Sequence, residues 1–136
     1  MNIFICASKH NYHHVPPIKS ELEKIGHVIT LPNSYDNPGR EEEKRTLSAE
    51  EHAEWKGEML RLQIEKVQAN DAVFVLNMKK GELENYIGGA TFLEMFKAFE
   101  LGKKLFLYHS IPEGILRDEI LGMGPTVIHG DLSLIG

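Results

Sequence analysis

The sequence has little cysteine, no long apolar run and no excess of basic residues. Cys6 is the one cysteine, so no disulfide forms within the chain, and its apolar surroundings predict a buried thiol. No apolar run approaches the roughly 20 residues that a membrane-spanning helix needs, so we expect no membrane partner. The N-terminal residues lack the features of a signal peptide, and we expect a cytoplasmic protein.

The negative net charge also limits the classes of partner that the protein is expected to bind. The net charge is −5 at pH 7, whereas proteins that bind nucleic-acid polymers present basic surfaces that neutralise phosphates. Nucleic-acid polymers are therefore not expected as partners, and small ligands remain possible. The 136 residues, 42% of them hydrophobic, suit one globular domain spanning 1–136 with a single core.

Short apolar segments alternate with segments of helical character. The predicted strands are residues 2–7, 27–31, 71–76, 105–108 and 126–128. The predicted helices begin at Pro16 and Pro17, at a Ser48–Glu51 capping box, at Ala90 and near Ile115. In the second of these, Trp55, Met59, Leu62 and Val67 are spaced to form one apolar face.

This alternation predicts an α/β fold with a parallel sheet and helices on both faces. The simplest assignment is a flavodoxin-like, Rossmann-like five-stranded sheet in the order 2-1-3-4-5. Residues 2–7 and 71–76 are the most continuously apolar segments, so we expect them at its centre. Ligands of such sheets bind beyond the carboxyl ends of the strands, which selects residues 8–12, 32–33, 77 onward and 109–113 as candidates.

A polar segment, residues 32–47, separates the second strand from the long helix. Unstructured segments of this length within a compact domain are usually functional lids or disordered. We expect a mobile loop that lies over the ligand pocket. Its basic residues Arg40, Lys44 and Arg45 could contact a phosphate, although they are mixed with Glu41 to Glu43, and such a charged segment more often forms a solvated surface.

The most informative segment runs from Asn85 to Lys104. Gly88 and Gly89 would let the backbone approach a ligand at a helix N-terminus, where free N–H groups favour an anion; a simple glycine turn is the alternative. Glu94 shares its side of the helix with small residues and could face a cavity, although a helical Glu is more often exposed.

The phrase GGATFLEMFKAFELGKKLFLYHSIPE, residues 88–113, resembles the nucleoside 2-deoxyribosyltransferase-like family. The segments CASKHNY at 6–12 and NDAVFVLN at 70–77 extend the resemblance. It implies a flavodoxin-like fold, a deoxyribonucleoside or deoxyribonucleotide substrate, no metal or organic cofactor, and a homodimer or larger homo-oligomer.

The resemblance also implies roles for particular residues. Glu94 would be the nucleophile that attacks the anomeric carbon. The implied activity is that of an N-glycosidic bond hydrolase or transferase. The candidate substrate-binding residues are Ser8, Tyr12, Asn77, Gly88, Gly89, Thr91 and His109.

Two departures from the family pattern leave a second hypothesis open. Gln63 falls where family enzymes carry an Asp before the third strand, and Gly88 falls where another acidic residue is usual. A neutral amide supplies no general acid or base, so the alternative is a non-catalytic nucleotide-binding or sensing module. His10, His13 and His14 crowd one loop without the companion ligands of a metal site, and we expect no metal.

Overall fold

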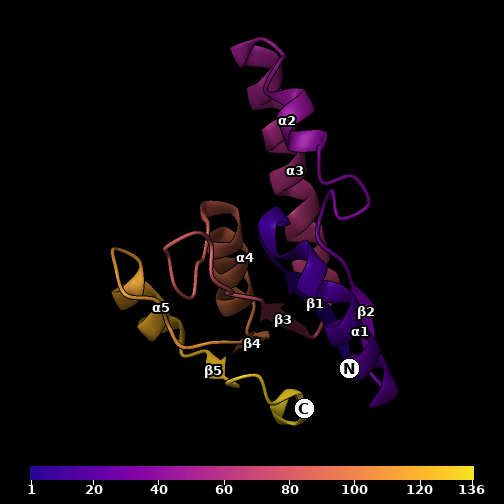
Figure 1. Cartoon of the computed structure of the whole chain (residues 1–136), viewed down its shortest axis with the longest axis vertical. Coiled ribbons are helices and arrows are strands. Elements are labelled where there is room, and N and C mark those ends of the chain that lie inside the picture. Colours follow the sequence, from indigo (N-terminus) through magenta and orange to yellow (C-terminus); the bar gives the residue numbers. More distant parts are fainter.

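The computed structural model describes residues 1–136 and contains one five-stranded parallel sheet in the order β2-β1-β3-β4-β5. Its strands are β1 (Asn2–Cys6), β2 (Val28–Thr30), β3 (Ala72–Val75), β4 (Lys104–Leu107) and β5 (Thr126–Val127). The predicted α/β fold and strand order are confirmed. In Figure 1 the strands lie in the lower half of the molecule, with helices on either side.

The two strands predicted at the centre of the sheet do lie inside it. β1 pairs with β2 and β3, and Ile3 is opposite Ala72 in the second pairing. β3 is covered on both edges because it also pairs with β4. Every residue of β3 is buried, as expected for a parallel strand covered by helices on both faces.

Alternate residues of the central strands divide the core into two halves. Ile3 and Ile5 pack with helix α1 (Val15–Lys24) on one face of the sheet. Phe4 and Cys6 point to the other face, because successive side chains of a strand alternate. That second face is covered by α3 (Ala49–Ala69), α4 (Gly89–Glu100) and α5 (Arg117–Met123).

Ser48 is the N-cap residue of the long helix, as predicted. The backbone N–H of Glu51 donates to Ser48 Oγ at 3.1 Å, and Ser48 Oγ in turn donates to Glu51 Oε1 at 3.0 Å. The resulting α3 is the longest helix of the chain. Figure 1 shows its first half rising away from the sheet, with helix α2 (Arg40–Lys44) beside it.

The prediction of an apolar face on α3 is wrong at one position, Leu62. Val67 is fully buried, but the side chain of Leu62 is 39% exposed, and Gln63 takes the buried place instead. Adjacent helical residues are about 100° apart, and the side of α3 that faces the sheet runs through Gln63 and Val67. Leu62 consequently turns toward solvent.

Local structure also appears where loops were expected. Residues after β1 form a 3-10 helix, Lys9–His14, that leads directly into α1. The polar segment 32–47 contains α2, a short helix rich in glutamate. The final helix, α5, begins at Arg117 rather than at Ile115.

No helix of the chain is both long and apolar enough to cross a bilayer.

Candidate functional site

A pocket of about 410 Å³ lies beyond the carboxyl ends of β1 and β2, between the 3-10 helix, α2, α3 and the start of α4. This edge of the sheet is where parallel α/β folds bind ligands. The pocket brings together most of the residues singled out from the sequence. Those that line it are Ser8, Tyr12, Gly88, Gly89, Thr91, Glu94 and Gln63.

Glu94 is the buried acid of this pocket. It lies in the second turn of α4 and is 8% exposed. Burial penalises the charged form of a carboxyl group, and it raises the pKa of Glu94 to about 7. At neutral pH the carboxyl group therefore exists in both protonation states, which is a property that catalytic sites share.

Three neighbours of Glu94 oppose this effect of burial, and the smallest of the three contributions to the lower pKa comes from Lys56. The thiol of Cys6, at the end of β1, forms a hydrogen bond with the Glu94 carboxylate and lowers its pKa. The ammonium group of Lys66 on α3 also lowers it. Burial, together with the negative charge of Glu94, raises the pKa of the Cys6 thiol well above its usual range, so the thiol stays protonated and acts as the donor.

Lys66 is itself held in place by contacts with the end of β2 and with β1. Its Nζ donates to the backbone carbonyl of Leu31 at 2.9 Å and lies 5.7 Å from the centre of the Phe4 ring. Burial lowers the pKa of Lys66, while the carboxylate of Glu94 acts in the opposite direction. A cation fixed in this way stabilises negative charge at Glu94.

The start of α4 forms one wall of the pocket. Gly88 is the N-cap residue in an extended conformation, and no side chain caps the helix. The first N–H groups of a helix have no partner within the helix, so here they can bind an anionic or polar ligand. A Cβ atom added at Gly89 would meet nothing within 4 Å, which leaves open space at this wall.

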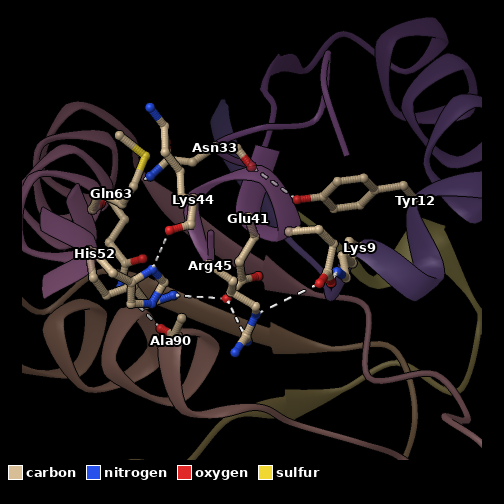
Figure 2. A network of polar contacts seen from close by, with 12 residues as sticks. Lys9, Tyr12, Asn33, Glu41, Lys44, Arg45, His52, Gln63 and Ala90 are labelled. Atoms are coloured by element: carbon tan, nitrogen blue, oxygen red, sulfur yellow. Dashed lines mark hydrogen bonds and ion pairs between the residues drawn. The ribbon is translucent and has the colours of Figure 1, made fainter. Parts of the chain in front are cut away.

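Gln63 lies in the pocket wall, on α3. It is 7% exposed, and its Nε2 donates to the backbone carbonyl of Ala90 at 3.1 Å, as Figure 2 shows. Gln63 and Glu94 thus belong to the same pocket. One N–H of the amide is bonded to the backbone of α4, and the side chain offers no titratable group.

Tyr12 closes the side of the pocket next to the first loop. Its hydroxyl group donates to the backbone carbonyl of Asn33 at 3.0 Å (Figure 2). Burial and the charge of Glu94 raise the pKa of Tyr12 to about 12, so the phenol stays neutral. Asn33 in turn donates from Nδ2 to the carbonyl of Met59 at 3.0 Å, which ties the segment after β2 to α3.

The mouth of the pocket carries a network of ion pairs that the sequence did not reveal (Figure 2). We call Lys9, Arg45 and Lys56 the mouth cations and the two glutamates of α2 that pair with them, Glu41 and Glu42, the α2 carboxylates. All five line the pocket. Lys9 pairs with Glu42, and Lys56 Nζ lies 3.6 Å from Glu41 Oε1.

Arg45 joins both carboxylates, with 3.4 Å between its Nη2 and Glu41 Oε1 and 3.8 Å between its Nε and Glu42 Oε2.

Segment 32–47 lies at the pocket, as its length and polarity predicted. The sequence signal for Lys9 was its place in the loop after β1, at the ligand-binding edge. Lys56 had no such signal, because a lysine on a long helix is usually just a solvated charge.

Two predicted binding residues lie outside this pocket. Asn77 is fully buried, and its Nδ2 donates to the carbonyls of His109 and Ser110, both at 3.0 Å. Its Oδ1 accepts from the N–H of His109 at 2.8 Å. Asn77 thereby joins the ends of β3 and β4, and the ring of His109 packs edge-on against Tyr108.

The histidines of the first loop are dispersed. The rings of His13 and His14 lie tilted against each other with centres 4.1 Å apart, whereas His10 lines the pocket. Burial and the neighbouring His13 and His109 lower the pKa of His14. No three His, Cys, Asp or Glu side chains of the chain lie close enough to hold a metal ion.

Comparison with known proteins adds no family to this description. No protein-family model matches the chain, and no curated protein matches it.

Proposed function

We propose that this protein cleaves the N-glycosidic bond of deoxyribonucleosides or their monophosphates, as a hydrolase or a transferase, with Glu94 as nucleophile. The observation that carries the proposal is a single buried carboxyl group, with a pKa of about 7, that opens into a pocket at the ligand-binding edge of the sheet. Resemblance to the nucleoside 2-deoxyribosyltransferase-like family supplies the substrate class.

The proposed chemistry has two steps. The carboxylate of Glu94 attacks the anomeric carbon of the sugar while the bond from that carbon to the base breaks. The bonding electrons leave with the base, which takes up a proton from solvent. Water, or a second base, then attacks the same carbon, breaks its ester bond to Glu94 and restores the carboxylate.

The surroundings of Glu94 suit these demands. Lys66 and the Cys6 thiol favour the ionised carboxylate that attacks. The open N-terminal turn of α4, with Gly88, Gly89 and Thr91, offers N–H groups and a hydroxyl group to the sugar or phosphate. Ser8 and Tyr12 would contact the base or phosphate from the opposite wall.

The experiment that tests this function measures free base after incubation with deoxyribonucleosides and their monophosphates. We expect wild type to release base, and Glu94→Ala to abolish release while keeping the ligand-induced rise in Tm. Glu94→Gln, which keeps the shape and removes the charge, should behave in the same way. Full activity in either variant would contradict the role of Glu94.

One observation favours a second candidate, a non-catalytic nucleotide-binding or sensing module. Gln63 occupies a buried place in the pocket wall where the family carries an acid, and its amide is bonded to Ala90. Loss of general acid or base help typically costs about a hundredfold to ten-thousandfold in rate. If wild type binds these ligands and releases no base, the sensing function is the correct one.

We further propose that the protein is cytoplasmic and works as a homo-oligomer. The exposed face of α4 supports the assembly, because Leu93, Phe96 and Phe99 are each about half exposed on one side of the helix. Light scattering should give at least the mass of a dimer at micromolar concentration. Phe96→Glu should lower this mass, whereas Leu134→Glu, at a similarly exposed apolar residue, should leave it unchanged.

A further inference from the structure

The mouth of the pocket concentrates positive charge in a protein whose net charge is −5. The mouth cations come from three places: Lys9 from the 3-10 helix, Lys56 from α3, and Arg45 from the residue that follows α2. They meet only in the fold, and each lines the same pocket as Glu94. Such a cluster attracts anions into a cleft.

The α2 carboxylates are the anions that these cations hold in the present structure. Glu41 pairs with Lys56 and Arg45, and Glu42 pairs with Lys9 and Arg45. The pair of carboxylates supplies a charge close to that of a phosphate monoester, which carries about −1.5 to −2 at pH 7. One phosphate group could thus replace both carboxylates without changing the charge balance of the mouth.

The exchange is also energetically accessible. The side chains of Glu42 and Arg45 are 61% and 60% exposed, and an ion pair this open to solvent contributes little to stability. The side chain of Glu41 is 33% exposed, so its displacement costs more than that of Glu42. A phosphate offers several oxygens to the fork of an arginine and to two lysines at once, which makes it a stronger partner than separate carboxylates.

We propose that the mouth cations form a subsite for the phosphate group of a small phosphorylated ligand, and that the α2 carboxylates occupy this subsite until the ligand displaces them. The inference rests on the proposed function for the rest of the ligand. It selects the deoxyribonucleoside monophosphate over the deoxyribonucleoside, with the sugar toward Glu94 and the phosphate at the mouth.

Isothermal titration calorimetry with deoxyribonucleosides, their 5′-monophosphates and inorganic phosphate tests the subsite. Wild type should bind the monophosphate at least tenfold more tightly than the nucleoside. The double variant Lys9→Ala, Lys56→Ala should lose at least tenfold in affinity for the monophosphate and keep its affinity for the nucleoside. Inorganic phosphate should compete with the monophosphate and not with the nucleoside.

A second variant tests the displacement itself. Glu41→Gln with Glu42→Gln removes the competing charges, so the affinity for the monophosphate and for inorganic phosphate should rise several-fold. Glu43→Gln is the matched control, since it removes a charge from the same helix at a residue that neither lines the pocket nor forms an ion pair. An equal effect of Glu43→Gln would mean that only overall charge matters and would overturn the displacement.

The outcomes separate this inference from the proposed function. Equal affinity of wild type for nucleoside and monophosphate overturns the subsite, even if base is released from both. Phosphate-dependent binding that is lost in the double lysine variant supports the subsite, even if no base is released from either. In that second case the protein is a sensor of phosphorylated ligands.

Discussion

Gln63 on α3 donates a hydrogen bond from Nε2 to the backbone carbonyl of Ala90 at 3.1 Å. Ala90 lies one helical turn before Glu94, so this bond fixes the start of α4 against α3 and helps to place the carboxylate in the pocket. A neutral side chain consequently has a positioning role at the place where the proposed chemistry would benefit from an acid.

Replacing Gln63 by Asp should change activity and stability in opposite directions. An acid in the pocket wall would supply the missing proton transfer, and we expect base release to be at least tenfold faster. Loss of the hydrogen bond to the half-buried Ala90 carbonyl removes one contact between α3 and α4, and we expect a cost of about 0.5–1.5 kcal/mol in the free energy of unfolding. Product chromatography and urea unfolding measure the two effects.

Gln63→Asn is the matched control for that variant. It shortens the side chain by the same amount and remains neutral, so it should lose stability without any gain in rate. If the Asn and Asp variants release base at the same rate, the acid at this position has no catalytic effect. The activity would then depend on Glu94 without help from α3.

The pH dependence of the reaction should report the titration of Glu94. The nucleophile must be ionised, and burial raises its pKa to about 7, so kcat/KM should rise with pH and level off above about 7. Cys6→Ala removes a hydrogen bond that lowers this pKa, and its profile should move to higher pH. A profile of wild type that is flat between pH 5 and 8 would exclude Glu94 as the ionising nucleophile.

The free energy of unfolding should also depend on the titration of Glu94, and it should fall as the pH rises. The folded-state pKa of Glu94, about 7, lies above its ordinary value of 4.5. Between these values the folded chain keeps a proton that the unfolded chain has lost, so stability falls as the pH rises through this window. Between pH 5 and 8 wild type should lose about 2–3 kcal/mol more than Glu94→Gln.

Urea unfolding at the two pH values gives this difference, and a second variant controls for charge. Glu100→Gln removes a carboxylate from the end of the same helix, where the side chain is exposed. It should follow the pH dependence of wild type. If Glu94→Gln also follows wild type, Glu94 is not held in the protonated form by the fold.

The sheet could be predicted from the sequence because short, continuously apolar segments indicate strands that are buried on both faces. The strand order follows from the continuous apolar character of 2–7 and 71–76, and the ligand-binding edge follows from the strand order. Glu94 could be singled out because small residues share its side of α4, and Thr91 and Ala98 are indeed buried with it.

Of the mouth cations, Arg45 was a candidate from the sequence, but the ion pairs that join the mouth of the pocket could not be predicted in this way. The pair between Lys9 and Glu42 joins residues 33 positions apart, and charged residues carry no periodic signal of where they meet. The error at Leu62 has a related cause. Spacing alone fixes the face of a helix only to within about one residue, and here the polar Gln63 occupies the buried position that spacing assigned to an apolar neighbour.

Gly89 at the start of α4 offers a test of close ligand approach that leaves the fold intact. Gly89 adopts a helical conformation, and a Cβ added there would meet nothing within 4 Å. Gly89→Ala should therefore raise stability by about 0.4–1 kcal/mol by restricting the unfolded chain. The new methyl group would enter the pocket, and the affinity for deoxyribonucleoside monophosphates should fall at least tenfold.

Gly57→Ala separates these two effects, because Gly57 is a helical glycine of α3 outside the set of residues that line the pocket. Its added Cβ would lie 3.8 Å from Arg61 Nη1, an ordinary contact, so stability should rise here too while affinity stays at the wild-type value. Thermal unfolding and calorimetric titration of both variants make the comparison. Unchanged affinity in Gly89→Ala would show that the ligand does not approach the backbone at the start of α4, and the contact proposed between this helix end and the ligand would have to be abandoned.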